Sequence, residues 1–595
     1  MKTHLNVSKG RILIAVVAVA LCLERAASAV TLTITPSAIS NDYRGVVTLQ
    51  VGGLTNGESV TVGKFGDGDG DGLVSTNDWL LQGFRVTDGK AKTISGATNY
   101  NVPYDQTGTN GEITTWVSYL ENGPNHLVGQ QLFIVRGSSG TATNTLTLTN
   151  WPYSQTITGA IQCSGTNVPY AGVVLLTPEP GGDMTFGAGV MADSAGNYSV
   201  HMPPGVYMPL PFRPGFVADM SAAPVIALTP GVTVATNVDL LLATRLLSGR
   251  VVDAGDTNTG LPGVFLIVES PNGHMAISSA NSNGVFNIPV TAGLWRTEVD
   301  DASLTPLGYV RLENFPVFDT TAGDVTNALI QIPKGTAMFY GTIKTDSNAP
   351  LVAVRFYGSD SNHVYGASGV SDPNGNYSVA VLPGTWSVGL DDDNPALAGY
   401  VVGGGTNGVG LSTNQALRVD FLAKRTAATI SGWVKDNTSN PVVGLYVYAH
   451  ADSDGSPYNQ SAQTDAAGNY SLNVAHGSWH VGLSCWNDDG LENLGYECVN
   501  ERVVSVPPTN AVANFTVYPI GTPRLDPPVF TSPGQLAFAL YGRGGTNYVV
   551  QVSTNLAEPS AWSTLANFAP TSSVYTVWDN QATNEQRFYR VKIGP

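Results

Sequence analysis

The sequence predicts an all-β protein built as a tandem array of β-sandwich domains. Three observations lead to this prediction: a length of 595 residues, a turn-rich composition with 67 Gly and 36 Pro, and an internal repeat. The length exceeds what one hydrophobic core organises, since domains hold about 100 to 200 residues. Charged residues make up only 12% of the chain, which is far from the composition of coiled coils and helical repeats.

The charge balance limits the class of partner. The formal net charge is −17 at pH 7, so nucleic acid is not an expected partner, because a polyanion binds basic surfaces. Hydrophobic residues make up 42% of the chain, which is enough to build cores and argues against a disordered acidic tail.

The first element is a predicted signal peptide at residues 1–29. Three basic residues precede the apolar run 12–23, and Ala-Ser-Ala at 27–29 supplies a small-residue cleavage pattern. The apolar run is shorter than the ~20 residues of a membrane span, so we expect cleavage and no membrane span afterwards. The predicted location is therefore secreted, extracellular or at the cell surface.

The second element, residues 30–153, contains strand-like runs that predict a β-sandwich with a polar insertion. Within it, the segment 67–78 reads DGDGDGLVSTND and has the spacing of an EF-hand calcium loop, with Gly72 at the sharp turn. Alternating Asp residues bring several oxygens to one side, as a hard cation requires. The alternative is a solvated acidic turn without an ion. The predicted Ca²⁺ ligands are Asp67, Asp69, Asp71, Leu73, Ser75 and Asp78.

The middle of the chain repeats every ~91 residues. The segments ITGAI, LSGRV, FYGTI and ISGWV begin the four copies, and each contains a glycine that we name the entry glycine. Each copy then has a turn with Asp or Asn first and Gly fourth, followed by alternating apolar residues that predict a strand. A Gly-x-aromatic stretch and a Gly-aromatic pair follow. The predicted domains are 154–244, 245–335, 336–426 and 427–523. The entry glycines are Gly159, Gly249, Gly341 and Gly432. The fourth residues of the turns, which we name turn glycines, are Gly196, Gly284, Gly375 and Gly468, and the glycines of the Gly-aromatic pairs, which we name pair glycines, are Gly215, Gly308, Gly399 and Gly495.

The repeats resemble a known family. Small-Gly-x-Val, PVVGLYV at 441, Asp-x-x-Gly-Asn-Tyr-Ser and Gly-x-Trp-x-Val are similar to carboxypeptidase regulatory-like domains. The resemblance covers 154 to about 523 and implies immunoglobulin-like or transthyretin-like seven-stranded sandwiches, with a carbohydrate-binding-like fold close to Cna B-type and starch-binding-like modules. It implies modules that accompany enzymes and surface proteins without being catalytic.

The last element is a C-terminal β-module at 524–595, preceded by a Pro-rich segment at 519–533 that composition predicts to be a linker. Its strand-like runs resemble a short β-module found at the end of many large secreted bacterial proteins. We expect Phe588, Tyr589 and Val591 to close its core.

The cysteines and histidines give few candidate sites. An oxidising destination predicts a disulfide between Cys485 and Cys498, which leaves Cys163 unpaired. His476 and His480 have the spacing of a helical zinc pair, but they flank a predicted hairpin, so we do not expect them to bind a metal together. The signatures HExxH, GxSxG and Walker A do not occur, so the sequence predicts no enzyme.

The tryptophans divide into two groups. Trp295, Trp386 and Trp479 recur at one register, which predicts core residues, although stacking on a sugar ring is the alternative. Trp486 and Trp433 do not recur, and they are the possible carbohydrate-binding residues.

Together these observations predict a secreted or cell-surface, noncatalytic multidomain protein. Its repeats act as spacer and interaction modules, and calcium stabilises its N-terminal domain. The alternative is a carbohydrate-binding protein associated with polysaccharide capture or degradation, with polysaccharide or a cell-surface glycan as partner.

Overall fold

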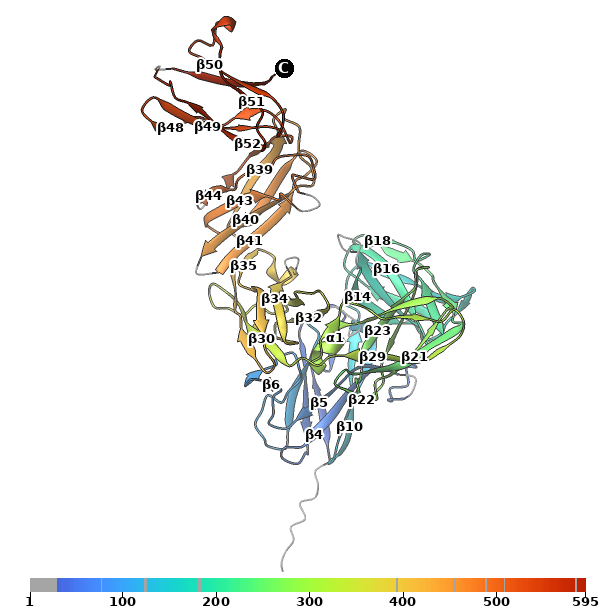
Figure 1. The fold of residues 1–595 in the computed structure, drawn as a ribbon. Coiled ribbons are helices and arrows are strands. Elements are labelled where there is room, and N and C mark those ends of the chain that lie inside the picture. Colours follow the sequence, from blue (N-terminus) through green and yellow to red (C-terminus); the bar gives the residue numbers. More distant parts are fainter. Residues whose placement is uncertain are drawn as a thin grey trace, which may run out of the picture. The chain divides into compact units, whose positions relative to one another are not determined.

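The computed structural model describes residues 29–75, 78–121, 126–178, 184–391, 394–453, 456–486, 490–507, 509–583 and 586–594. Strands dominate these residues, and α1 (Asp301–Leu304) is the one α-helix among them. The prediction of an all-β tandem array is confirmed (Figure 1). The predicted signal peptide lies outside the described residues except for Ala29. No helix in the described part of the chain has both the length and the apolar character to cross a membrane.

The chain forms two compact units. The first holds the described residues up to Thr93, together with Val102–Leu307 and Phe315–Pro333. The second holds Ile94–Asn101, Gly308–Asn314 and the described residues from Lys334 onward. The N-terminal domain and repeats 1 and 2 therefore lie mainly in the first unit, and repeats 3 and 4 with the C-terminal module lie in the second.

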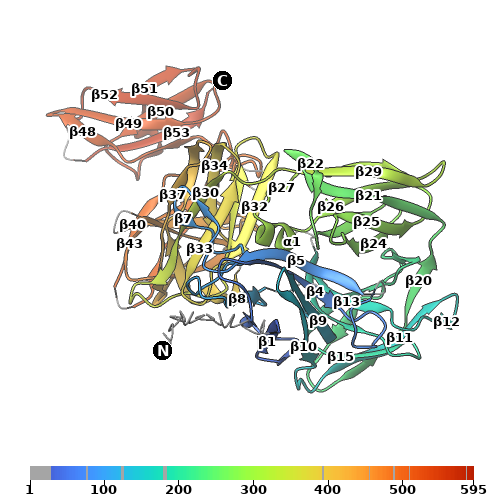
Figure 2. The ribbon, with the colours of Figure 1, turned by 90° about the horizontal axis from the view of Figure 1, so that it is seen from below.

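The N-terminal domain is a sandwich of two sheets, because its strands alternate buried and exposed residues and so have one apolar face each. The core between the sheets contains Val47, Leu49, Val60, Phe133 and Leu146. One sheet joins β1 (Thr31–Thr35), β3 (Val46–Gly52) and β8 (Ile113–Ser118). The other joins β2 (Ala38–Ser40), β10 (Gly140–Thr149), β9 (Leu127–Gly137), β4 (Ser59–Gly66) and β5 (Trp79–Thr87) (Figure 2).

Each repeat packs two sheets face to face, one around its first strand and the other with four strands of its own. In the sheet around the first strand, the strand after the turn pairs antiparallel with the first strand, and the last strand pairs parallel with it. The first strands are β11 (Thr156–Cys163), β21 (Arg245–Asp253), β30 (Ala337–Thr345) and β39 (Ala428–Asp436). The strands after the turn are β15 (Asn197–His201), β25 (Val285–Val290), β33 (Asn376–Val381) and β42 (Asn469–Val474). The last strands are β20 (Val238–Leu242), β29 (Val325–Ile332), β38 (Phe421–Arg425) and β46 (Phe515–Val517).

The four-stranded sheet is built on a hairpin and on the strand of the Gly-x-aromatic stretch. The hairpins are β13 (Gly172–Pro178) with β14 (Met184–Met191), β23 (Phe265–Glu269) with β24 (His274–Ser279), β31 (Arg355–Asp360) with β32 (Tyr365–Val370), and β40 (Tyr446–Ser453) with β41 (Ser456–Gln463). The Gly-x-aromatic strands are β16 (Gly205–Phe212), β26 (Leu294–Val299), β34 (Gly384–Leu390) and β43 (Gly477–Leu483).

The predicted turn occurs in all four repeats. Its first side chain accepts hydrogen bonds from the amides two and four residues later, as Asp372 does from Asn374 and Asn376 at 2.8 Å each. Asp193, Asn281 and Asp465 form the same pair of bonds. The turn glycines have φ between 73° and 79°, which side chains disfavour.

The recurring aromatic residue is buried in every repeat, so the prediction that it is core is confirmed. Tyr207, Trp295, Trp386 and Trp479 are at most 5% exposed. Each donates its polar hydrogen to the carbonyl four residues earlier, at 2.9 Å in all four copies. The buried ring therefore leaves no polar atom without a partner, as a core aromatic requires.

Consecutive modules are joined by strand pairs that we name junctions. One strand segment of each junction consists of the third and fourth residues after the pair glycine, and we name it the donor. The other segment, which we name the acceptor, consists of the ninth and tenth residues before the turn glycine of the next repeat. The donors lie in β17 (Phe216–Asp219), β27 (Arg311–Leu312) and β35 (Tyr400–Gly403), and they pair antiparallel with β24, β32 and β41. Since β17 and β35 also pair with the last strand of their own repeat, one sheet runs from that repeat into the next.

The two ends of this series differ from the internal junctions. Repeat 1 has no preceding repeat, and its β14 pairs parallel with β9 of the N-terminal domain. In repeat 4, the positions equivalent to the donor are Cys498 and Val499, and neither belongs to a strand. Cys498 is instead bonded to Cys485.

The C-terminal module has two small sheets. Its core contains Phe538, Leu540 and Tyr548, with Tyr589 and Val591 packed against it, as expected, whereas Phe588, the third residue expected there, is not part of this core. One sheet contains β47 (Arg524–Leu525), β48 (Val529–Ser532), β49 (Gln535–Tyr541) and β52 (Val574–Asp579), and the other contains β50 (Tyr548–Ser553), β51 (Ser563–Phe568) and β53 (Phe588–Ile593). The prediction that 519–533 is a linker was wrong, because β47 and β48 lie in it and pair with β49.

Candidate functional sites

The acidic loop connects β4 to β5 of the N-terminal domain. One carboxylate oxygen from each of Asp67, Asp69 and Asp71 lies within 4.8 Å of the other two. Three carboxylates that face one small volume repel each other unless a cation neutralises them, and oxygen donors suit a hard divalent ion. The residues therefore fit Ca²⁺ in chemistry and in spacing.

Backbone amides hold the loop in its curved form. Asp67 accepts from the Gly70 amide at 2.7 Å and from the Gly72 amide at 3.1 Å, so the chain wraps around its carboxylate. Gly70 and Gly72 have φ of 73° and 74°, a conformation that glycine permits at low cost. The Gly72 turn that the motif predicts is therefore present.

Asp78 closes the loop and is not part of the three-carboxylate group. Its two oxygens accept from the Gly68 amide at 2.9 Å and the Ser75 amide at 2.5 Å. Burial raises the pKa of Asp78, and the nearby charge of Asp69 acts in the same direction. A bound cation would favour the ionised form that these two effects oppose. The Leu73 amide donates to Asp71 at 2.7 Å, which places that residue within the same turn.

Arg213 of repeat 1 reaches the loop, although no motif in the sequence points to it. Its guanidinium donates to the carbonyl of Gly68 at 3.1 Å and to that of Tyr170 at 2.6 Å. Burial lowers the pKa of Arg213, while the charge of Asp69 raises it. Because Arg213 comes from a separate domain, its position beside the loop depends on the tertiary fold and not on local spacing.

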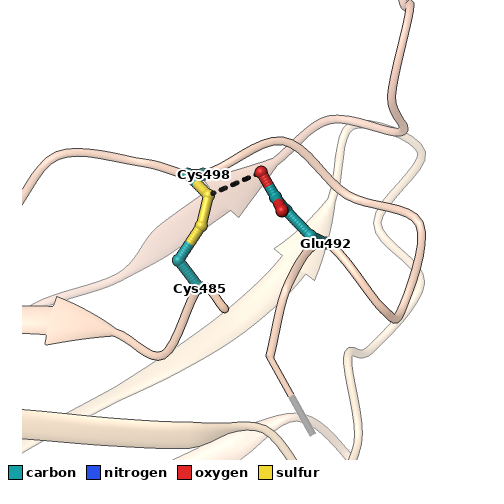
Figure 3. The surroundings of a disulfide bond; sticks show 3 residues. All are labelled: Cys485, Glu492 and Cys498. Atoms are coloured by element: carbon teal, nitrogen blue, oxygen red, sulfur yellow. Dashed lines mark hydrogen bonds between the residues drawn. A yellow bond between two sulfur atoms is a disulfide. The ribbon is translucent and has the colours of Figure 1, made fainter. Parts of the chain in front are cut away.

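The structure brings together the two cysteines predicted to pair. Cys485 and Cys498 are joined by a disulfide with a Cα–Cα separation of 5.5 Å, and Glu492 lies beside Cys498 (Figure 3). Leu491, inside the closed loop, is buried in the core of repeat 4, which anchors the loop. Cys163 is a free, partly buried thiol.

The two possible carbohydrate-binding residues differ in accessibility. Trp486 is 80% exposed and follows Cys485 directly, so the disulfide holds its backbone. Trp433 is half-buried on β39, and the ammonium group of Lys435 lies 5.4 Å from its ring centroid. The face of Trp486 is therefore the more available to a sugar ring.

Comparisons with known proteins give only distant likeness. No protein-family model matches the chain, and no curated protein matches it. The Bacillus anthracis TIE protein is 15% identical over 67% of this chain and 75% of its own, with a TM-score of 0.16. A Streptococcal ancillary pilin is 12% identical over 46% of this chain and 98% of its own, with a TM-score of 0.16. A DUF3823 family protein from Parabacteroides merdae is 10% identical over 28% of this chain and 89% of its own, with a TM-score of 0.14. The fold class is established by the strands and sheets of this chain itself.

Proposed function

We propose that this chain is a secreted or cell-surface, noncatalytic spacer whose repeats are carboxypeptidase regulatory-like modules. The observation that carries the proposal is the junction. It recurs at the same donor and acceptor positions after repeats 1, 2 and 3. Because the same strand pair recurs at the same positions between successive repeats, we infer that it connects modules and does not form a catalytic site.

Within a unit, strand pairing across a junction restrains movement between neighbouring modules. A flexible linker leaves two domains free to reorient, whereas a shared sheet must break backbone hydrogen bonds to bend. At the junction between repeats 3 and 4, β35 contacts β38 on one side and β41 on the other. Repeats 3 and 4 should therefore move as one body.

The experiment measures that restraint with spin labels. Asn374 and Ala467 occupy equivalent, exposed turn positions in repeats 3 and 4. Labels on Asn374→Cys and Ala467→Cys, in a Cys163→Ser background of the full chain, should give one narrow distance distribution by pulsed electron paramagnetic resonance. Labels on Asn374→Cys and Thr385→Cys, both within repeat 3, set the width expected for a single domain. A distribution much broader than this control would contradict the spacer function.

We also propose that Asp67, Asp69, Asp71, Leu73, Ser75 and Asp78 bind one Ca²⁺, with the affinity of extracellular modules, roughly 10⁻⁴ to 10⁻³ M. The ion would supply positive charge to three adjacent carboxylates. Arg213 already ties the same loop to repeat 1, so a loop ordered by calcium would also order the contact between the N-terminal domain and repeat 1.

A second function is favoured by the exposure of Trp486. An aromatic ring that is held by a disulfide loop and open to solvent suits stacking on polysaccharide. A glycan array probed with the mature chain tests this, with Trp486→Ala expected to lose any signal and Trp433→Ala expected to keep it. An array without signal would contradict the carbohydrate-binding function and leave the spacer function standing.

A further inference from the structure

Three ligand-type side chains meet on one face of the four-stranded sheet of repeat 4. His450 on β40 pairs directly with His480 on β43. Val503 of β44 (Arg502–Val506) lies opposite His480, and Glu501 precedes Val503 by two residues, so its side chain projects from the same face. The strands therefore deliver two imidazoles and one carboxylate to one place.

The side chains converge on the carboxylate. Nδ1 of His450 lies 4.0 Å from Oε1 of Glu501, and Nδ1 of His480 lies 3.7 Å from Oε2. The imidazole rings are stacked, with centroids 5.0 Å apart and planes inclined by 13°. One ligand atom from each of the three residues lies within 4.8 Å of the others. Both imidazoles therefore turn the same nitrogen toward the same carboxylate.

A fourth side chain orients the group. The hydroxyl of Tyr448 donates to Oε1 of Glu501 at 3.1 Å, and its ring stacks 6.5 Å from that of His450. The ring also covers Gly482, where an added Cβ would meet it at 2.4 Å. Tyr448 thus fixes the carboxylate in the manner of an outer-shell partner of a metal ligand.

We propose that His450, His480 and Glu501 form a Zn²⁺ site. Two imidazole nitrogens and one carboxylate oxygen are the ligand set of open zinc sites, in which water takes the fourth position. Bonds of about 2.0 to 2.2 Å require ligand atoms roughly 3.5 Å apart, so the three side chains must rotate toward a common point, and the near-parallel imidazole rings must tilt toward each other, when the ion binds. The three side chains are between 32% and 45% exposed, so the ion has free access. Calcium does not compete, because it prefers oxygen ligands.

The zinc site is separate from the junctions and from the acidic loop. Its three ligand residues lie far apart in the sequence. His476, the neighbour that spacing suggests for His480, lies exposed in the turn before β43 and is not part of the group. It is therefore a matched control in the same repeat.

The test measures zinc binding to the mature full-length chain by isothermal titration calorimetry with zinc chloride. Millimolar Ca²⁺ fills the acidic loop, and a Cys163→Ser background removes the free thiol. We expect one Zn²⁺ per chain with a Kd on the order of micromolar, as for a three-ligand surface site. His450→Gln and His480→Gln should each weaken binding at least about tenfold, whereas His476→Gln should leave it unchanged.

Two further measurements keep the result interpretable. Circular dichroism without zinc shows whether each variant is folded, and Tyr448→Phe keeps all three ligands while removing the hydrogen bond to Glu501, so it should weaken binding severalfold. The proposal is overturned if no zinc binds at about 100 μM, some hundredfold above the expected Kd. It is also overturned if the His450→Gln and His480→Gln variants bind like the parent.

Discussion

The entry glycines occupy positions at which a Cβ atom does not fit. An added Cβ at Gly159, Gly249, Gly341 or Gly432 would lie 1.8 or 1.9 Å from the carbonyl oxygen of a crossing segment. In repeat 3 that oxygen belongs to Val419, and it also accepts the hydroxyl of Tyr377 at 2.7 Å. The close crossing therefore requires glycine, and a side chain would displace the segment that completes the sheet.

We expect Gly341→Ala to destabilise repeat 3 by about 1 to 3 kcal/mol, the usual cost of overpacking. Gly410→Ala in β36 (Thr406–Leu411) is the control, because an added Cβ there meets nothing within 4 Å. Hydrogen exchange of the β33 amides measures the local stability. Equal protection in the two variants would show that the crossing is not a steric constraint.

Asp300 makes stability depend on pH. It caps α1 by accepting from the Ser303 amide at 3.0 Å. Burial raises the pKa of Asp300 to about 7, and the charges of Asp301, Glu121 and Glu298 add to this. An unfolded aspartate titrates near 3.9, so the folded state binds more protons between about pH 4 and 7.

The first unit should consequently lose stability as pH rises from about 4 to 7, because the proton held by folded Asp300 is released in this window. Asp300→Asn should reduce this dependence, while Asp239→Asn, at an exposed position on β20, should leave it intact. Melting temperatures from pH 4 to 8 measure the effect. A parent protein whose melting temperature rises through this range would contradict the assignment.

At the residue scale, the sequence predicted positions whose partners are local. The turn aspartates bond to amides two and four residues away, and the recurring tryptophans bond four residues back, so spacing was enough. Arg213, His450 and Glu501 could not be predicted, because their partners come from other domains or from strands far apart in the sequence. Only the sheet register places them together.

At the element scale, the junction register predicts a crosslink. Val402 of β35 and Asn459 of β41 face each other, and directly opposed antiparallel residues have Cα atoms about 4.5 to 5.5 Å apart, within reach of a disulfide. Val402→Cys with Asn459→Cys should therefore crosslink under mild oxidation. Val402→Cys with Ser461→Cys, two residues along β41, should not, since the separation is about 7 to 8 Å.

Mass spectrometry of digested protein identifies the crosslink. Equal yields in the two pairs would show that β35 and β41 slide or separate, which would also weaken the spacer proposal. The sequence did not predict these junctions, because the donors are short and carry no common residue: the pairing positions are Ala218 and Asp219, Arg311 and Leu312, and Val402 and Gly403. Backbone atoms make the connection, so side-chain patterns do not reveal it.

The disulfide of repeat 4 gives a second prediction at this scale. Alkylation of the unreduced mature protein should modify Cys163 alone, and reduction should make Cys485 and Cys498 reactive as well. Closing a loop of this length stabilises the folded state by roughly 3 kcal/mol in the chain-entropy estimate. Three alkylated cysteines in the mature protein before reduction would contradict the bond.

At the scale of the whole molecule, the two features expected to stabilise the fold, the acidic loop and the disulfide, lie in different units. The acidic loop lies in the first unit and the disulfide in the second. With Ca²⁺ at 10 mM, binding at the expected affinity stabilises the first unit by about 1.4 to 2.7 kcal/mol. EDTA should therefore lower one calorimetric transition, and a reductant should lower the other.

Asp67→Asn should abolish the response to EDTA and preserve the response to the reductant. Cys485→Ser with Cys498→Ser should do the reverse. If EDTA leaves every transition of the parent unchanged, the acidic loop is a turn without an ion. The predicted domain boundaries divide the chain more finely than these two units do.

The register of the junctions has a consequence for assembly. A donor and an acceptor carried by the same module form a head-to-tail contact, and such contacts propagate into open filaments unless something stops them. In repeat 1, β9 pairs with Gly189 and Val190 of β14, beyond the positions equivalent to the acceptor. In repeat 4, the disulfide ties the last donor segment at Cys498 to its own repeat, and that segment is not a strand. Head-to-tail extension through this pairing therefore ends at repeat 4, where a disulfide-held loop takes the place of the donor strand.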